Sequence, residues 1–223
     1  RVNKVGPELA RNLPAVHLLP AGDLAASSRE HMVIDIRNAA SFADGHVVGA
    51  MNVPSNSLVQ WAGFFVDYNK PLFLLTNADS LAANLRSLRS IGIDNVQGYF
   101  DINASEVQKQ FTEAYSSATP QELAASIENG SVRLIDVRAA TDFNEGHIQN
   151  AEHHFLGNLL RQLSQMDKSK PLVVQCLAGG RSAIGTSILQ RAGFKVTNMS
   201  GGYKAWRASG LPNHLEEPTT VGS

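Results

Sequence analysis

An internal repeat constrains the fold of this chain more than any other feature of its 223 residues. The stretch DLAASSREHMVIDIR (23–37) recurs as ELAASIENGSVRLIDVR (122–138), about 100 residues later. Three further pairs keep a similar spacing: SFADGHVVGAMNVP (41–54) with TDFNEGHIQNAEHHF (141–155), KPLFLLT (70–76) with KPLVVQC (170–176), and LRSIGI (88–93) with LQRAGF (189–194). This period exceeds that of solenoid repeats, so we expect two copies of one domain.

The order of predicted elements in the second copy indicates an α/β fold. Thr119, Pro120 and Glu122 predict a helix start with a capping box. Strands are expected in 133–137 and 171–176, a strand and a turn in 193–202, and helices around 156–166, 181–192 and 203–210. Because strands alternate with helices, we predict two tandem domains, each a mainly parallel sheet flanked by helices on both faces.

The repeat divides the chain into five parts. Residues 1–16 form an N-terminal extension or linker, 17–100 the first domain, 101–118 a connection, 119–214 the second domain and 215–223 a polar tail. The chain starts without a methionine, which we interpret as a fragment or a processed product.

Composition excludes several classes of function. With 19 basic and 20 acidic residues, the net charge of −1 provides no attraction to nucleic acid or an anionic membrane. No apolar run approaches the roughly 20 residues that span a bilayer, and no signal peptide is recognisable. We therefore expect a cytoplasmic protein without nucleic-acid or membrane partners. Seven histidines and one cysteine without clustered ligand spacing predict no metal site, and the absence of phosphate-binding and dinucleotide motifs predicts no cofactor.

The most informative stretch for chemistry is VVQCLAGGRSAIGTSILQ (173–190), which holds the only cysteine, Cys176. Ligands of parallel sheets bind beyond the carboxyl ends of the strands, where Cys176 is expected. Two glycines let N–H groups converge on an anion, the next helix directs its positive end there, and Arg181 adds a full charge. Most lone cysteines in apolar runs are buried and inert. The order strand, cysteine, glycines, arginine, helix favours a stabilised thiolate instead.

The histidines offer no convincing general base for a hydrolase. His147 recurs as His46 in the copy without a cysteine, so we predict a structural role for it. His153 and His154 are adjacent on an extended segment, whose successive side chains face opposite ways, so at most one points toward the cysteine.

The motifs resemble those of rhodanese-type sulfurtransferases. CLAGGRS is similar to their C-x-x-G-x-R-S active loop, LIDVR…F…GHI to their entry motif, and MSGGYKAW…GLP (199–212) to the end of their domain. The resemblance implies that Cys176 is the nucleophile that accepts sulfane sulfur as a persulfide. It implies that loop amides hold the terminal sulfur and that Arg181 binds the anionic donor or fixes the loop. The implied loop residues are Leu177, Ala178, Gly179, Gly180, Arg181 and Ser182. Asp136 and Arg138 resemble a supporting charged pair.

The first copy lacks this loop, and we predict that it is catalytically silent. Thr76 stands where Cys176 stands, and TNADSLAANL contains Asp79 but neither glycine nor arginine, and is one residue shorter. A silent domain followed by an active one resembles classical two-domain sulfurtransferases. RVNKVGP (1–7) and GHIQNAEHHFLGNL (146–159) more closely resemble the C-terminal part of fusions that join a metallo-β-lactamase-fold persulfide dioxygenase to rhodanese domains. This resemblance implies an upstream dioxygenase domain as a partner.

The expected function is transfer of sulfane sulfur from thiosulfate or a low-molecular-weight persulfide to an external thiol, or to cyanide in an assay. The alternative is a non-enzymatic persulfide carrier or docking module. A small-anion phosphatase or arsenate reductase is disfavoured by the length of the loop. The phosphatases that resemble this family have the pattern C-x5-R, which is wide enough for phosphate, whereas Cys176 and Arg181 give the shorter C-x4-R.

Overall fold

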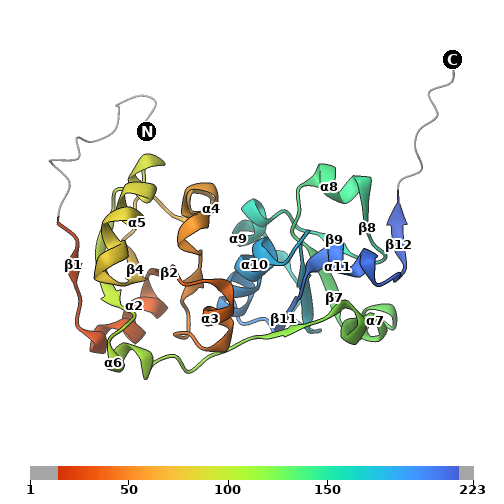
Figure 1. The fold of residues 1–223 in the computed structure, drawn as a ribbon, viewed down its shortest axis with the longest axis horizontal. Coiled ribbons are helices and arrows are strands. Elements are labelled where there is room, and N and C mark those ends of the chain that lie inside the picture. Colours follow the sequence, from red (N-terminus) through yellow and green to blue (C-terminus); the bar gives the residue numbers. More distant parts are fainter. Residues whose placement is uncertain (1–14, 216–223) are drawn as a thin grey trace, which may run out of the picture. The chain divides into compact units, whose positions relative to one another are not determined.

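The computed structural model describes residues 15–215 and divides the chain into two compact units, Arg1–Ala114 and Tyr115–Ser223 (Figure 1). Each unit contains a five-stranded sheet in which every neighbouring pair of strands is parallel. Helices flank the sheet in each unit. The prediction of two tandem α/β domains with mainly parallel sheets is confirmed. The predicted extension 1–16 and tail 215–223 fall almost entirely outside the described residues.

The first sheet has the strand order β1-β5-β4-β2-β3. Its strands are β1 (His17–Leu18), β2 (Met32–Asp35), β3 (Met51–Asn52), β4 (Leu72–Thr76) and β5 (Val96–Asp101). The helices of this unit are η2 (Ala21–Asp23), α2 (Leu24–Glu30), α3 (Ala39–Asp44), η3 (Ser55–Ser57), α4 (Leu58–Phe65), α5 (Ala78–Ser90) and α6 (Ser105–Gln108). Fully buried apolar side chains of the central strands, such as Ile34, Leu74 and Phe100, form its core.

The second sheet has the order β6-β11-β10-β7-β9, and β8 and β12 form a separate antiparallel pair. The strands are β6 (Ser116–Ala118), β7 (Arg133–Asp136), β8 (Gly146–Ile148), β9 (Glu152–His153), β10 (Leu172–Gln175), β11 (Val196–Met199) and β12 (Asn213–Leu215). The helices are α7 (Pro120–Glu128), α8 (Ala140–Glu145), η4 (Leu156–Asn158), α9 (Leu159–Gln162), η5 (Leu163–Gln165), α10 (Gly180–Arg191) and α11 (Gly202–Ala208).

Helices cover both faces of the second sheet. Val173 of β10 packs in one cluster with Leu123 of α7 and Trp206 of α11. The next residue, Val174, faces the opposite side. There, a Cβ added to Gly185 of α10 would lie 3.4 Å from a Val174 methyl group, so the glycine lets this helix pack closely on the strand. Among residues 15–215, no helix has both the length and the apolar character needed to cross a membrane.

Local sequence signals account for most of these elements. The capping box at the start of α7 is present, since Thr119 accepts the Glu122 N–H and the Glu122 carboxylate accepts the Thr119 N–H. The helix expected around 156–166 is instead three short helical segments, η4, α9 and η5.

The segment expected to connect the domains, 101–118, also differs from a plain linker. Its first residue ends β5, and its last three residues form β6, which pairs with β11 at the edge of the second sheet. β6 reads Ser-Ser-Ala, with no apolar alternation to reveal a strand. It is held by pairing with a strand that lies about 80 residues further along the chain.

Candidate active site

The cysteine loop lies at the carboxyl edge of the second sheet. Cys176 directly follows β10, and the residue is 2% exposed. Three residues separate it from Gly180, the first residue of α10. Gly179 has φ +99°, a left-handed conformation that favours glycine. This turn directs the Gly179 N–H to the Cys176 Sγ at 3.2 Å. The thiol therefore lies at the N-terminus of α10.

Several further N–H groups of the loop are available to an anion. In residues 15–215, no acceptor takes the N–H of Leu177 or Ala178, nor those of Gly180, Arg181 and Ser182 in the first turn of α10. The first amides of a helix lack intrahelical acceptors and carry its partial positive charge. The loop thus combines free donors with a helix N-terminus, as anion-binding loops do.

The start of α11 fixes the backbone of the loop. The Tyr203 N–H donates to the Cys176 carbonyl at 2.7 Å, and the Lys204 N–H donates to the Leu177 carbonyl at 3.0 Å. A Cβ on Gly202, whose φ is +55°, would lie 2.1 Å from the Cys176 carbonyl oxygen. Only glycine permits this approach. This contact explains the second glycine of the Gly201-Gly202 pair in MSGGYKAW, and the spacing alone did not reveal it.

The remaining loop side chains have distinct surroundings. The Arg181 Nη1 lies 3.5 Å from the Asp142 Oδ2, and the two side chains are 26% and 43% exposed. The Ser182 hydroxyl donates to the Gly179 carbonyl at 3.0 Å and closes the turn. Leu177 is 48% exposed and presents an apolar surface beside the cysteine. Asp142 was not among the residues predicted for the site, because its position on α8 is far from the loop in sequence.

Asp136 and Arg138 form a buried pair beside the loop. Asp136 ends β7, opposite Gln175 in the register with β10. Its carboxylate accepts the Arg138 Nε–H at 3.0 Å and the Nη2–H at 2.7 Å, and Nη2 also donates to the Gly146 carbonyl at 2.8 Å. The Arg138 guanidinium lies 4.3 Å from the centroid of the Tyr203 ring. These contacts join β7, the first residue of β8 and α11. The supporting role of the pair stays a prediction.

His147, His153 and His154 contact residues other than Cys176. The His147 Nδ1 lies 2.9 Å from the Phe143 carbonyl, and the two rings stack at 3.9 Å. The His153 Nε2 pairs with the Arg138 carbonyl at 2.9 Å, and the His154 Nδ1 pairs with the Gln162 Oε1 at 3.0 Å. These contacts favour structural roles. Within the described part of the chain, no group of three or more histidine, cysteine or carboxylate side chains is placed to hold a metal.

In the first unit, the corresponding loop is closed by its own polar groups. Thr76 ends β4 and is fully buried. Its hydroxyl lies 2.9 Å from the Ser80 hydroxyl and accepts the Asn84 Nδ2–H at 3.2 Å. The Asn77 Oδ1 accepts the Ser80 N–H at 2.8 Å, which caps α5.

The connection between strand and helix in the first unit is shorter than the sequence predicted. Only Asn77 separates β4 from α5, whereas three residues separate Cys176 from α10. The expected deletion of one residue is confirmed over the whole segment, since Ser90 ends α5 14 positions after Thr76 and Arg191 ends α10 15 positions after Cys176. The connection itself is two residues shorter. The reason is that the Asn77 cap starts α5 one residue earlier relative to the strand.

The fold and the cysteine loop define a protein of two similar α/β domains, one of which contains a thiol at a helix N-terminus. The Rhodanese-like domain family matches the chain twice, at residues 21–101 and 119–209. These matches cover more than half of the chain, which therefore belongs to the rhodanese-like domain family and contains two such domains.

Each match to a named relative spans about the length of one of the two domains. Thiosulfate sulfurtransferase GlpE of Shewanella oneidensis is 33% identical over 94 residues, which is 42% of this chain and 93% of the relative. Thiosulfate sulfurtransferase GlpE of Actinobacillus pleuropneumoniae is 30% identical over 102 residues, which is 45% of this chain and 94% of the relative. The crystal structure of a rhodanese-related protein from Thermoplasma volcanium is 26% identical, with a TM-score of 0.43, and the match covers 46% of this chain and all of that one.

Proposed function

We propose that this protein is a sulfurtransferase that carries sulfane sulfur as a persulfide on Cys176. The observation that carries the proposal is the placement of its single thiol at the N-terminus of α10, with the Gly179 N–H directed at the sulfur. The similarity to relatives named thiosulfate sulfurtransferase supports it. We propose thiosulfate or a low-molecular-weight persulfide as the donor and an external thiol as the acceptor.

In the first half-reaction, the Cys176 thiolate attacks the sulfane sulfur of thiosulfate. A bond forms between Sγ and that sulfur, the S–S bond of thiosulfate breaks, and sulfite leaves with the electron pair. The total charge of −3 is the same on both sides. With a persulfide donor, the same attack releases the donor's thiolate.

In the second half-reaction, an acceptor thiolate attacks the terminal sulfur of the Cys176 persulfide. The acceptor becomes a persulfide, and Cys176 leaves as a thiolate. With cyanide the product is thiocyanate. The chain contains no second cysteine, so the acceptor is an external molecule.

The loop residues have separate roles in this scheme. The amides from Leu177 to Ser182 hold the terminal sulfur and its negative charge, since N–H donors directed at a developing charge stabilise it more in a water-poor site. Arg181 attracts the anionic donor. Asp136 and Arg138 hold the surrounding backbone in place, and Thr76 marks a site without chemistry.

We also propose a persulfide dioxygenase domain as the partner of this protein, with a cytoplasmic location. The resemblance of RVNKVGP and GHIQNAEHHFLGNL to the fusions described above supports this. A reducing compartment keeps a lone thiol free. Reading the gene upstream of Arg1 tests the proposal, which fails if no dioxygenase sequence lies in the same frame or beside it.

Mass spectrometry tests the reaction itself. The chain is incubated with thiosulfate, desalted and weighed, and thiocyanate formation is then followed with cyanide. We expect a mass increase of one sulfur atom that cyanide removes, and neither signal in Cys176→Ser. An intact, folded protein that gains no sulfur from thiosulfate or from a small persulfide would overturn the proposal.

A further inference from the structure

One ion pair joins the two segments that border the cysteine loop. β7 and β10 are parallel neighbours, so their carboxyl ends lie at the same edge of the sheet. α8 follows β7 at this edge, and the cysteine loop follows β10. The contact between Asp142 of α8 and Arg181 of α10, at 3.5 Å, therefore lies beside the site of the thiol.

Arg181 is the only cation among residues 177–182, so its partner controls how much positive charge the loop offers. The nearby cation Arg138 is already committed to Asp136 and to the Gly146 carbonyl. Arg181 and Asp142 both remain partly exposed, and a solvent-exposed pair of this kind is held weakly. An anion that enters the loop can therefore compete with Asp142 for the guanidinium.

The silent domain lacks both partners of this pair. α3 and α8 correspond through Phe42 and Phe143, and the third helical residue is Ser41 in α3 and Asp142 in α8. The second helical residue is Asp79 in α5 and Arg181 in α10. The arginine and its carboxylate partner therefore occur together, in the copy that has the cysteine.

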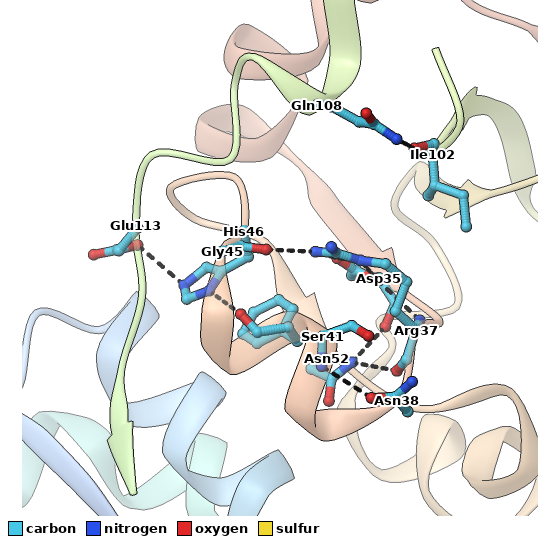
Figure 2. Close-up of polar contacts among 11 residues, drawn as sticks. Asp35, Arg37, Asn38, Ser41, Gly45, His46, Asn52, Ile102, Gln108 and Glu113 are labelled. Carbon is cyan, nitrogen blue, oxygen red and sulfur yellow. Dashed lines mark hydrogen bonds and ion pairs between the residues drawn. The ribbon is translucent and has the colours of Figure 1, made fainter. Parts of the chain in front are cut away.

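The two helix starts also differ in their caps. In the first unit, Asn38 accepts the Ser41 N–H at 2.9 Å (Figure 2), and Asn77 accepts the Ser80 N–H at 2.8 Å. The N-cap residues of α8 and α10 are Ala139 and Gly179, and neither provides a side-chain cap. The first unit therefore caps both helix starts with local asparagine side chains. In the second unit these caps are absent, and each helix start instead carries one partner of the Asp142–Arg181 ion pair.

We propose that Asp142 is a specificity-determining residue that sets how strongly the site prefers donors of low charge. This rests on the proposed sulfurtransferase function. The Asp142 carboxylate occupies Arg181 and adds a negative charge beside the entering donor. Both effects disfavour a dianion more than a monoanion, because Coulomb repulsion grows with the donor's charge. Thiosulfate carries two charges, and benzenethiosulfonate offers the same sulfane sulfur with one.

Steady-state kinetics of Asp142→Asn with these two donors tests the proposal. We expect the KM for thiosulfate to fall about fivefold with kcat within about twofold of wild type, and the KM for benzenethiosulfonate to fall about twofold. Glu145→Gln removes the same charge from the last turn of α8, and the structure shows no ion pair of Glu145 within residues 15–215. This control should leave both KM values unchanged.

A double-mutant cycle separates positioning from helix stabilisation, since Asp142 also lies in the first turn of α8. In an Arg181→Gln background, Asp142→Asn should no longer change the ratio of the two KM values by more than about 1.5-fold. A change that persists there, equal changes for both donors, or an unchanged ratio in the single variant would overturn the proposal. If wild type itself shows no Cys176-dependent transfer, the proposed function fails instead, and the assignment of Asp142 with it.

Discussion

The two domains share their supporting contacts and differ in one loop, which follows β4 in the first domain and β10 in the second. In both, an aspartate at a strand end binds an arginine two residues later, and that arginine also donates to the carbonyl of Gly45 or Gly146. Figure 2 shows this arrangement in the first domain. In both, a histidine stacks on a phenylalanine one turn earlier. Features present in both copies therefore serve the fold, and those confined to one copy are candidates for chemistry.

The same support can come from unrelated parts of the chain. The Arg37 guanidinium lies 4.1 Å from the centroid of the Phe111 ring, which follows the first domain's last helix. Arg138 instead lies 4.3 Å from the ring of Tyr203, in α11. Each aromatic ring covers a charged pair and stabilises the cation through its π face. Both domains therefore place an aromatic ring over this arginine, but the ring comes from a different part of the chain in each.

Moving the thiol between the domains gives the largest expected effect. In a chain with Thr76→Cys and Cys176→Ser, the new thiol would lie in a fully buried position beside Ser80 and Asn84, without a glycine turn or an arginine. We expect sulfur transfer to cyanide to fall at least about 1,000-fold below wild type, as when a nucleophile is removed. Thiocyanate formation measures this.

The single variant Thr76→Cys is the matched control for that experiment. It should keep wild-type activity and gain one sulfur atom per chain, although it contains two thiols. A gain of two sulfur atoms would show that the first domain is silent only because it lacks a cysteine, and the contrast between the loops would lose its meaning.

Gly202 offers a second test of the contrast between the domains. In the second domain the Tyr203 N–H donates to the Cys176 carbonyl, and in the first domain the Ile102 N–H donates to the Thr76 carbonyl. Asp101, the residue before Ile102, is therefore the counterpart of Gly202. A side chain is thus tolerated at this position in the first domain. Gly202→Ala places a Cβ 2.1 Å from the Cys176 carbonyl at φ +55°. We expect a loss of about 2–4 kcal/mol in the free energy of unfolding, measured by denaturant titration, together with reduced activity.

Gly130→Ala separates this steric effect from backbone strain. Gly130 has φ +67° and no atom within 4 Å of an added Cβ, so its replacement should cost only about 1 kcal/mol. Equal costs for the two variants would mean that the contact with the Cys176 carbonyl has no special weight.

The order of strand, loop and helix at Cys176 could be predicted because each part has a local signal. An apolar run of β-branched residues, two glycines and a helix start stand next to one another in the sequence. The capping box at Thr119 was predictable for the same reason. By contrast, β6 is a strand only because β11 pairs with it, and three serine and alanine residues show no periodicity. The chemical roles of Cys176 and its loop stay predictions.

The contacts that sequence reasoning missed all join residues far apart in the chain. Asp142 reaches Arg181 across the edge of the sheet, and Gly202 approaches the Cys176 carbonyl from another helix. Comparison of the copies offered a signal for both. Asp142 and Gly202 differ in type from their counterparts Ser41 and Asp101. The repeat pairs Phe42 with Phe143 and so already places Ser41 opposite Asp142. Asp101 is recognised as the counterpart of Gly202 only from the backbone hydrogen bonds to the Thr76 and Cys176 carbonyls.

The smallest expected effect concerns His46, whose pKa is lowered by burial. His46 is buried, its Nδ1 lies 2.7 Å from the Phe42 carbonyl, and its Nε2 lies 3.6 Å from the Glu113 carboxylate (Figure 2). Burial lowers the pKa of His46 below 6.5, and the charge of Arg37 acts the same way. The Phe42 carbonyl and the carboxylates of Glu113 and Asp35 oppose this shift.

This shift predicts how the stability of the first domain depends on pH. The folded state prefers the neutral ring, so the unfolded chain binds more protons below about pH 6.5. The contribution of the neutral His46 ring to the stability of the folded domain is present above that pH, and it is lost as the pH falls through the lower pKa of the folded state. The slope of the unfolding free energy against pH cannot exceed about 1.4 kcal/mol per pH unit for one proton.

Denaturant titrations between pH 4.5 and 7.5 (a range of about three units) should show a shallower slope for His46→Gln than for wild type. His147→Gln, the same change in the second domain, should keep the wild-type slope of the first. If His46→Gln leaves that slope unchanged, burial of this ring does not govern the acid sensitivity of the first domain.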